Sequence, residues 1–179
     1  ISAQTLGDLV SANETGDYGV TVLGFEAADP AKYGRLVAED TTTLSKIVEA
    51  KDATPAELEI TLCNSGVIAA ERKTLFDLIA RIGNDNASGE YYLTDVVELA
   101  VASGMRARYV TCPEDETLGI NSRVQLADAE AVFQRNARLG VMTDGVTLAE
   151  PSSVYFSFDT KIAQDVIIGP NVVFGPGVT

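Results

Sequence analysis

The sequence contains no histidine in its 179 residues. Within this segment, that absence excludes zinc sites built on imidazole, Ser-His-Asp triads and histidine general bases. Cysteine is also scarce: Cys63 and Cys112 lie far apart and lack the short spacing of metal ligands. We therefore interpret the two cysteines as reduced, buried thiols of a cytosolic protein.

Basic residues are few as well, with 13 Lys and Arg against 26 Asp and Glu and a formal charge of −13. This balance argues against nucleic acid or an anionic membrane as a partner, because both require a basic surface. A bound phosphate would have to be met by backbone amides, a few local cations or a divalent metal ion. No stretch approaches the roughly 18 to 20 apolar residues of a membrane span, and the first residues do not resemble a signal peptide.

Apolar residues make up 46% of the chain, a content typical of globular proteins. Branched and aromatic residues predict strands at 18–26, 44–49 and 105–112. Residues 57–70 predict a further strand, interrupted by a turn at the tripeptide Asn64–Gly66.

Helical periodicity appears in three segments. Residues 73–83 place Leu75, Leu78, Ile79 and Ile82 on one face, with Gly83 at the expected C-cap. Thr94 is the candidate N-cap of a helix with apolar Val97, Ala100 and Val101, and Gly104 lies beyond its end. Residues 121–139 carry a capping-box pattern at Ser122 and Gln125 and a stripe of Leu126, Ala129, Phe133 and Ala137. Strands alternating with helices predict an α/β layer with both faces of the sheet covered.

After about residue 150 a six-residue period replaces the helical one. The units 162–167, 168–173 and 174–179 each open with a large apolar residue and have valine at position five. This pattern is typical of a hexapeptide β-helix in which the leading side chain points inward; the alternative is chance alternation in a two-stranded hairpin. Because several coils must stack for stability, and because the chain starts without Met, we expect a piece of a longer protein, cut within its second domain.

Four short stretches carry side chains suited to binding, and the first three also have a plain structural explanation. Gly34 in "YGR" allows close approach to backbone or forms an ordinary turn. Glu49 can accept hydrogen bonds from sugar hydroxyls or end a strand in solvent. Asn64 can bind hydroxyl or acetamido groups or make a turn. The stretch 89–95, "GEYYLTD", and Asn121 precede helices, at positions where ligands gather in sheet enzymes.

In order and spacing, these stretches resemble the bifunctional bacterial enzyme family N-acetylglucosamine-1-phosphate uridylyltransferase / glucosamine-1-phosphate N-acetyltransferase. The resemblance rests on "YGR", "IVEAKDAT", "NSG" (where the family usually has Asn-Thr-Gly), "NASGEYYLTD" and "GINSR", followed by a linking helix and hexapeptide repeats. "GEYYLTD" is the most distinctive of them.

The resemblance implies part of a Rossmann-like α/β nucleotidyltransferase domain over residues 1–122. A linker helix region would follow over 123–150, and the start of a left-handed parallel β-helix over 151–179. It implies that Gly34, Glu49, Asn64, Tyr92, Thr94 and Asn121 contact UDP-N-acetylglucosamine. Asn121 would also be a Mg²⁺ ligand, since Mg²⁺ prefers oxygen.

In the implied reaction, a phosphate oxygen of N-acetylglucosamine 1-phosphate attacks the α-phosphorus of UTP and pyrophosphate leaves. The family's glycine-rich loop, its lysine and its metal-binding aspartate do not occur in this sequence, so we expect no catalytic residue here and no activity of the segment alone. The acetyltransferase, which uses acetyl-CoA, would belong to later coils. The whole protein would be a cytoplasmic homotrimer.

Two alternatives remain open at this point. One is a different sugar-1-phosphate nucleotidyltransferase joined to a β-helix, which "GEYYLTD" fits poorly. The other is a catalytically dead relative that serves as a regulatory or assembly subunit.

Overall fold

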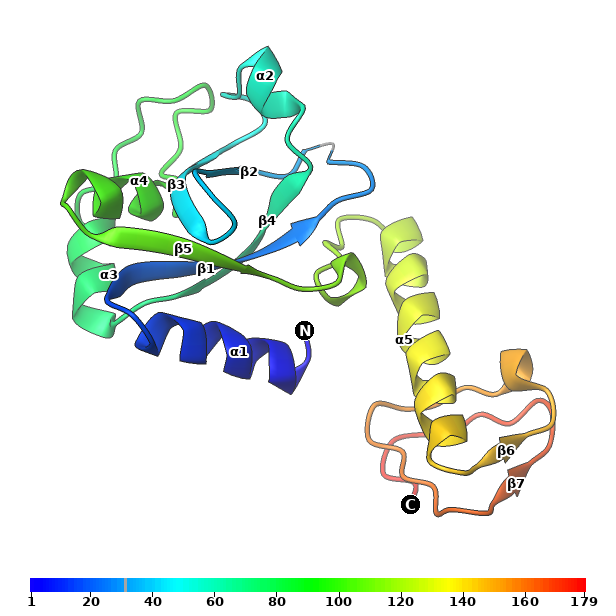
Figure 1. Ribbon diagram of the computed structural model, residues 1–179. Helices are drawn as coiled ribbons and strands as arrows, with labels where there is room; N and C mark the ends of the chain where they lie inside the picture. The colour runs from blue at the N-terminus through cyan, green and yellow to red at the C-terminus, as the bar shows by residue number, and fades with distance from the viewer. Residues whose placement is uncertain (31) are drawn as a thin grey trace. The chain divides into compact units, whose positions relative to one another are not determined.

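A computed structural model describes residues 1–30 and 32–179 (Figure 1). The chain divides into two compact units, unit 1 at Ile1–Thr117 and unit 2 at Leu118–Thr179. Each unit has its own hydrophobic cluster and is described by itself.

Unit 1 is built on five strands, which are β1 (Tyr18–Glu26), β2 (Arg35–Ala38), β3 (Thr43–Val48), β4 (Leu62–Ala69) and β5 (Arg106–Thr111). Their ladders follow the cyclic order β1-β4-β2-β3-β5, so the sheet closes on itself. The β1–β5 ladder is parallel and the other four are antiparallel. Closure depends on short ladders, because β2 meets β4 at a single pair, Arg35 with Cys63.

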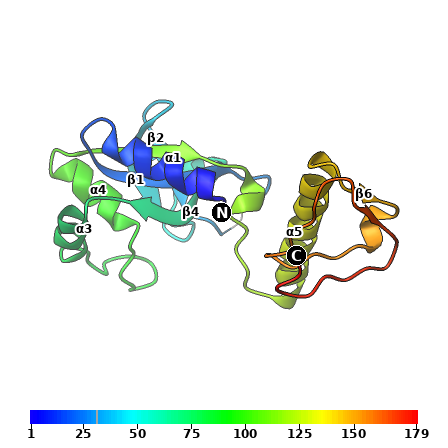
Figure 2. The ribbon, with the colours of Figure 1, turned by 90° about the horizontal axis from the view of Figure 1, so that it is seen from below.

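Helices α1 (Ala3–Glu14) and α4 (Asp95–Ala102) lie on opposite faces of strand β1. The other helices of unit 1 are α2 (Pro55–Leu58) and α3 (Arg72–Ile79), with a short 3-10 turn at Glu114–Glu116. Successive side chains of a strand point to opposite faces. Val20 and Val22 accordingly join the cluster that contains α4, whereas Thr21 donates a hydrogen bond from Oγ1 to Asn13 Oδ1 of α1 at 3.0 Å. Figures 1 and 2 show α1 running along β1.

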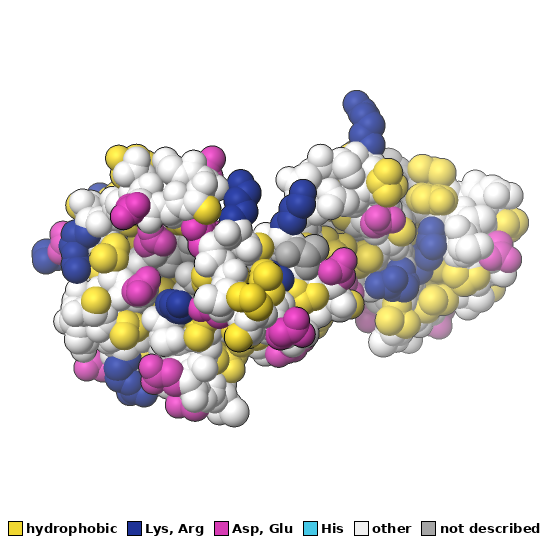
Figure 3. Space-filling view, turned by 90° about the horizontal axis from the view of Figure 1, so that it is seen from above, with side chains coloured by type: hydrophobic (Ala, Val, Ile, Leu, Met, Phe, Trp, Pro, Cys, Tyr) yellow, Lys and Arg dark blue, Asp and Glu magenta, His cyan; other side chains and the backbone are white. Residues whose placement is uncertain are grey.

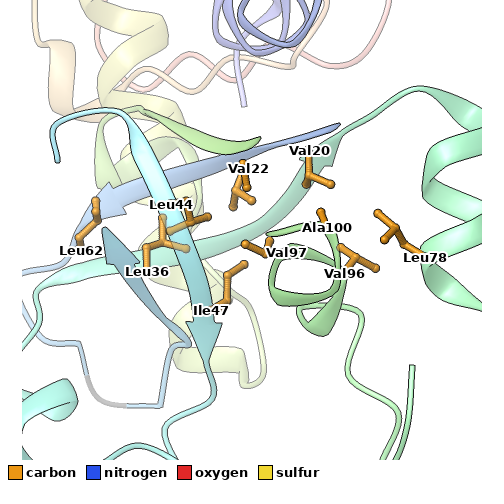
Figure 4. Close-up of a cluster of buried hydrophobic side chains, with 11 residues drawn as sticks. Val20, Val22, Leu36, Leu44, Ile47, Leu62, Leu78, Val96, Val97 and Ala100 are labelled. Carbon is orange, nitrogen blue, oxygen red and sulfur yellow. The ribbon is translucent and has the colours of Figure 1, made fainter. Parts of the chain in front are cut away.

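The main core lies between the strands and helices α3 and α4 (Figure 4). Its buried members are Val20, Val22, Leu36, Leu44, Ile47, Leu62, Leu78, Val96, Val97, Ala100 and Ala107. They come from all five strands and from both helices, so their burial packs β2 and β3 against α4.

The predicted turn at Asn64–Gly66 is wrong, because β4 continues through it. Pairing with β1 advances from Val22↔Ile68 to Gly24↔Asn64, so β4 carries two more residues than β1 across this step. Gly66 has a φ of 84°, and its N–H donates to Asn64 Oδ1 at 3.0 Å. The tripeptide thus makes a local turn-like bond inside a bulged strand.

One predicted helix end differs from the structure, and the two ends of α4 agree with it. Helix α3 ends at Ile79 with Ala80 as its C-cap, short of Gly83. Thr94 is the N-cap of α4, as predicted, but makes no side-chain cap bond, because its backbone is helical (φ −61°, ψ −23°) and not extended. Its hydroxyl donates to Glu49. Gly104 lies just beyond the α4 cap at Ser103 with a φ of 77°, as predicted.

Both cysteines are free thiols, Cys63 buried and Cys112 partly buried. They pack with Phe25 and Ala27 in a small second cluster. Burial raises the pKa of each thiol, which favours the protonated form.

Unit 2 consists of α5 (Arg123–Thr143) followed by a short irregular coil with β6 (Thr147–Leu148), a 3-10 turn (Pro151–Ser153) and β7 (Ile167–Ile168). Strands β6 and β7 pair in parallel, and Tyr155 makes a parallel bridge to Val173. The coil encloses Val146, Leu148, Val154, Phe156 and Ile168. Leading hexad residues Ile162 and Phe174 pack against this cluster, and Ile168 belongs to it, so the predicted inward direction is confirmed.

The fourth residue of every predicted hexad has a positive φ. The values are 65° at Asp165, 61° at Asn171 and 78° at Gly177. Asp, Asn and Gly are the residues that tolerate this left-handed conformation. The six-residue period therefore appears in the backbone conformation as well as in the burial of side chains.

The predicted capping of α5 is half confirmed. Gln125 N–H donates to Ser122 Oγ at 3.1 Å, but the Gln125 side chain accepts from Asn121 N–H instead of Ser122 N–H. Of the predicted apolar stripe, Ala137 packs on the coil, while Leu126 and Phe133 are 51% and 37% exposed. The stripe fails because the N-terminal half of α5 extends beyond the coil (Figure 1).

Acidic and basic side chains are interspersed on the face shown in Figure 3. Among residues 1–30 and 32–179, no helix is both long and apolar enough to cross a membrane.

Candidate functional site

Gly34 and Glu49 lie side by side at one end of the β2–β3 pair. Gly34 directly precedes β2 and Glu49 directly follows β3, where Arg35 pairs with Val48. A Cβ added to Gly34 would lie 3.4 and 3.5 Å from the two Glu49 carboxylate oxygens and 3.3 Å from Ile47 Cγ2. The Gly34 backbone therefore lies directly beside the Glu49 carboxylate, and Ile47 is the tightest neighbour that a side chain at this position would meet.

Thr94 holds the same carboxylate from the other side. Its Oγ1 donates to Glu49 Oε1 at 3.0 Å, and its side chain is buried. Thr94 comes from the start of α4, which packs on β3 through the main core. A hydrogen bond from a buried hydroxyl restricts the rotamers of Glu49 and leaves Oε2 available as an acceptor.

Asn64 joins this group through its backbone. Its N–H donates to the Gly34 carbonyl at 2.8 Å, which ties β4 to the start of β2. Its side-chain oxygen accepts from Gly66 N–H, so the local explanation of "NSG" holds for Oδ1. The amide nitrogen of the side chain keeps its donor capacity for a ligand.

A cavity of about 420 Å³ opens beside Glu49. It is lined by Lys32, Glu49, Ala50, Lys51, Ser88, Glu90 and Tyr92. A second cavity of about 310 Å³ shares Glu49 and Tyr92 and is otherwise lined by Lys46, Ile47, Val48, Asp52, Gly83, Asp85, Asn86, Asp95 and Glu98. Glu49 and Tyr92 thus separate a region with two lysines from a mainly acidic one.

The loop between α3 and α4 forms one wall of both cavities. Asn86 organises it by accepting from Ser88 N–H and Glu90 N–H at 3.1 and 3.2 Å. Asp52 Oδ1 accepts from Ala87 N–H at 2.7 Å, and Lys51 Nζ donates to Ser88 Oγ at 3.1 Å. These contacts fasten the "NASGEYY" loop to the "EAKD" turn, so two stretches distant in sequence share one site.

Asp95 lies on the acidic side of the site. Burial, reinforced by the neighbouring Glu98 and Asp52 charges, raises the pKa of Asp95.

The flanks of Gly34 have structural roles. The Tyr33 ring packs edge-on against Phe25 at 5.0 Å. Arg35 is 3% exposed and donates from Nη1 to the carbonyls of Pro30 and Tyr33. Both contacts fix the loop that delivers Gly34 to Glu49.

Five of the six predicted site residues therefore come together in unit 1: Gly34, Glu49, Asn64, Tyr92 and Thr94. Asn121 belongs to unit 2, where it is exposed and its N–H donates to Gln125 Oε1 at 2.7 Å. Its amide oxygen suits Mg²⁺ chemically. Within residues 1–30 and 32–179, no group of three or more His, Cys, Asp or Glu is placed to hold a metal ion.

The sequence reasoning missed Lys51, Ser88 and Glu90 as cavity residues. A signal was present for each of them. Lys51 follows Glu49 by two positions, and Ser88 and Glu90 precede Tyr92 by four and two. It also missed Lys32, two positions before Gly34.

No family model matches the chain. Several curated proteins named "Bifunctional protein GlmU" are similar to the chain in sequence. The Roseobacter denitrificans protein is 56% identical over 175 residues, or 98% of this chain. The Hyphomonas neptunium protein is 51% identical over 89% of this chain. The Cereibacter sphaeroides protein is 60% identical over 82% of this chain. The chain spans 38%, 35% and 32% of these three relatives.

Two solved structures are also similar. A nucleoside-diphosphate-sugar pyrophosphorylase from Vibrio cholerae has a TM-score of 0.49 at 14% identity and covers 72% of this chain and 49% of its own. An inositol-1-phosphate CTP transferase from T. maritima has a TM-score of 0.46 at 17% identity. The match covers 66% of this chain and 46% of the transferase chain.

The chain is similar along almost its whole length to proteins that carry one name, at 50 to 60% identity. On that sequence identity, this chain belongs to the family of the bifunctional GlmU proteins, of which it matches about a third.

Proposed function

We propose that this chain supplies the sugar-binding part of a uridylyltransferase site in a longer bifunctional enzyme. That enzyme would form UDP-N-acetylglucosamine from UTP and N-acetylglucosamine 1-phosphate. It would also acetylate glucosamine 1-phosphate with acetyl-CoA. The observation that carries the proposal is the contact of Gly34, Glu49 and Thr94 beside a cavity, within a chain 56% identical to a protein named bifunctional GlmU.

In this proposal, the residues of unit 1 bind and orient the sugar. The Glu49 carboxylate accepts hydrogen bonds from sugar hydroxyls, and Thr94 fixes its direction. Gly34 presents backbone without a side chain, and the Asn64 amide donates to the acetamido or hydroxyl groups. Tyr92 lines the cavity and supplies a ring face to the sugar. Held in this way, the sugar phosphate can direct an oxygen at the α-phosphorus of UTP, from which pyrophosphate departs.

Mg²⁺ fits the proposal through Asn121, which offers an exposed amide oxygen. When bound, the ion would neutralise phosphate charge. A single protein oxygen holds Mg²⁺ weakly, so the phosphates and ligands beyond the described residues would complete its shell.

We further infer that residues 151–179 begin a left-handed parallel β-helix, which would join three copies of the whole protein. Tyr155 and Val173 pair at a distance of 18 residues, or three hexads. Leu148 and Ile168 pair at a distance of 20 residues along the chain. We attribute the two additional residues of this first coil to the 3-10 turn at Pro151–Ser153. Phe156 stacks on Phe174 with ring centroids 5.2 Å apart, as expected of successive coils. The Rossmann-like domain, the division at residue 122 and a cytoplasmic location belong to the same proposal.

The test is calorimetric titration of the chain with UDP-N-acetylglucosamine and with UDP-glucose, each with and without Mg²⁺. We expect preferential binding of UDP-N-acetylglucosamine, reduced about tenfold or more in Glu49→Ala and in Asn64→Ala because each loses a polar contact to the ligand. Glu59→Ala, which changes an exposed carboxylate outside the cavities, is the control. Equal binding of both nucleotide sugars would instead favour a different sugar-1-phosphate nucleotidyltransferase.

A further inference from the structure

The larger cavity brings two lysines to a chain that is poor in cations. Lys32 and Lys51 both line it, although the chain carries only 13 basic residues against 26 acidic ones. Lys51 lies in the turn after β3, and Lys32 lies in the loop before β2. The paired geometry of β2 and β3 therefore delivers both lysines to the same end of the sheet as Glu49.

Neither of these lysines is neutralised by a carboxylate. In the part of the chain that the structure describes, the lysine ion pairs are Lys46–Glu57 and Lys73–Asp77. Lys51 Nζ donates instead to the hydroxyl of Ser88 at 3.1 Å, which holds the ammonium group on the cavity wall. Glu49 and Glu90 line the same cavity, yet neither lies within 4.0 Å of a lysine nitrogen.

The cavity thus has two chemically different parts. Around Glu49, fixed by Thr94 and Gly34, it offers an acceptor for hydroxyl groups. Lys32 and Lys51 offer positive charge with N–H donors and no acceptor. A ligand that matches both parts carries neutral hydroxyls and an anionic group on one small molecule.

We propose that Lys32 and Lys51 bind the phosphate of a phosphorylated sugar held by Glu49, and so make this half of the site selective for a sugar phosphate over the free sugar. The inference rests on the proposed function and assigns the anion contacts that the sugar residues alone do not provide. Ammonium–phosphate hydrogen bonds are charge-assisted and stronger than neutral ones, and the excess negative charge of the chain makes such local cations necessary. The phosphate could be the monoester of the sugar phosphate or the diphosphate of the nucleotide sugar.

The experiment is an NMR titration of the full chain with N-acetylglucosamine, N-acetylglucosamine 1-phosphate and UDP-N-acetylglucosamine. Wild type, Lys51→Gln, Lys32→Gln and the control Lys73→Gln are compared. Lys73 pairs with Asp77 on the exposed side of α3 and keeps the change in charge the same. We expect each cavity variant to bind the phosphorylated sugar about tenfold more weakly, the loss typical of one charge-assisted hydrogen bond. Affinity for the free sugar should stay unchanged.

Raising the salt concentration should weaken wild-type binding of the phosphate ester toward the level of the variants, because the lysines are exposed and screened. A loss confined to the sugar 1-phosphate identifies the monoester as the lysine ligand, and a loss for UDP-N-acetylglucosamine as well extends the contact to the diphosphate. Binding of the phosphorylated sugar that the variants leave intact overturns the inference while the sugar pocket stands. A folded wild-type chain that binds none of the three ligands overturns the proposed function, and the inference with it.

Discussion

At the scale of single residues, the hydroxyl of Thr94 is the contact on which the orientation of Glu49 depends. The Thr94→Val substitution keeps the shape of the side chain and removes the donor to Oε1. We expect UDP-N-acetylglucosamine affinity to fall about three- to tenfold, because a carboxylate with free rotamers loses conformational entropy when the ligand orders it. The unfolding free energy should change by less than about 1 kcal/mol, since water can reach the partly exposed Glu49.

Calorimetry and urea unfolding of the same samples measure the two effects. Thr94→Ser is the matched control: it restores the hydroxyl without the methyl group and should recover most of the affinity. Wild-type affinity in Thr94→Val would show that Glu49 is oriented by its packing on Gly34 instead.

The position of the site residues could be predicted from the sequence only in part. Gly34 and Glu49 flank strands and Asn64 lies within β4. Their residue types suggested binding, and the resemblance to a family supplied their roles. The Thr94 bond to Glu49 joins residues 45 positions apart and has no local signature. Local pattern predicted Thr94 as an N-cap, which is confirmed, but it could not predict that the hydroxyl makes a tertiary bond and no cap bond.

At the scale of elements, long periodic segments were predictable and short or weakly patterned ones were not. Strands β1 and β5 and helix α4 form where the sequence predicts them, and α5 forms over its predicted range although its apolar stripe is partly exposed. Helix α2 has four residues, yet Pro55 and the Thr54–Glu57 capping box were readable signals for it. Helix α1 was not predicted, because its apolar residues do not form a clear stripe and Gly7 lies in its middle.

Gln134 on α5 is the element-scale contact with the clearest consequence. It is 3% exposed, and its side-chain amide makes two bonds to the Phe156 backbone, donating to the carbonyl and accepting from the N–H, both at 2.8 Å. The amide thereby mimics a neighbouring strand for the coil. In Gln134→Ala, two buried backbone groups lose their partners, and we expect unit 2 to lose about 2 to 4 kcal/mol of stability.

Hydrogen exchange of the Phe156 amide, together with urea unfolding followed by the NMR signals of Tyr155, would measure this loss. Asn136→Ala changes an exposed amide on the same helix and is the control, expected to stay within about 0.5 kcal/mol of wild type. If both variants unfold alike, the coil does not depend on α5 for its backbone pairing.

At the scale of the whole molecule, acid has two opposing effects on stability. Protonation reduces the charge of −13 and with it the long-range repulsion among carboxylates. It also removes the carboxylates that make local hydrogen bonds. The second effect should prevail at low pH, because repulsion is already small near the isoelectric point of about 4.3, whereas local bonds persist to lower pH.

Asp40 and Glu57 carry this local contribution. Hydrogen bonds from the Thr43 and Thr42 N–H groups, 2.6 and 2.7 Å long, lower the pKa of Asp40 to about 2. The Lys46 ammonium at 2.7 Å, followed by Thr54, lowers the pKa of Glu57 to about 2. In the unfolded chain these groups titrate near about 3.9 and 4.3. The unfolded state therefore binds more protons in this range, and stability falls as the pH falls.

We expect the two carboxylates to make their full contribution to the unfolding free energy above about pH 5. This contribution should decline between about pH 4.5 and 2. Urea unfolding at half-unit pH steps measures the slope. Asp40→Asn and Glu57→Gln should each be less stable than wild type at pH 7 and show a shallower decline, because a neutral amide has no charge to lose. Asp128→Asn, on the exposed surface of α5, controls for the change in net charge and should keep the wild-type slope. Equal slopes in all four proteins would mean that acid acts through global charge, and that these two carboxylates do not anchor the β2–β3 turn and the start of α2.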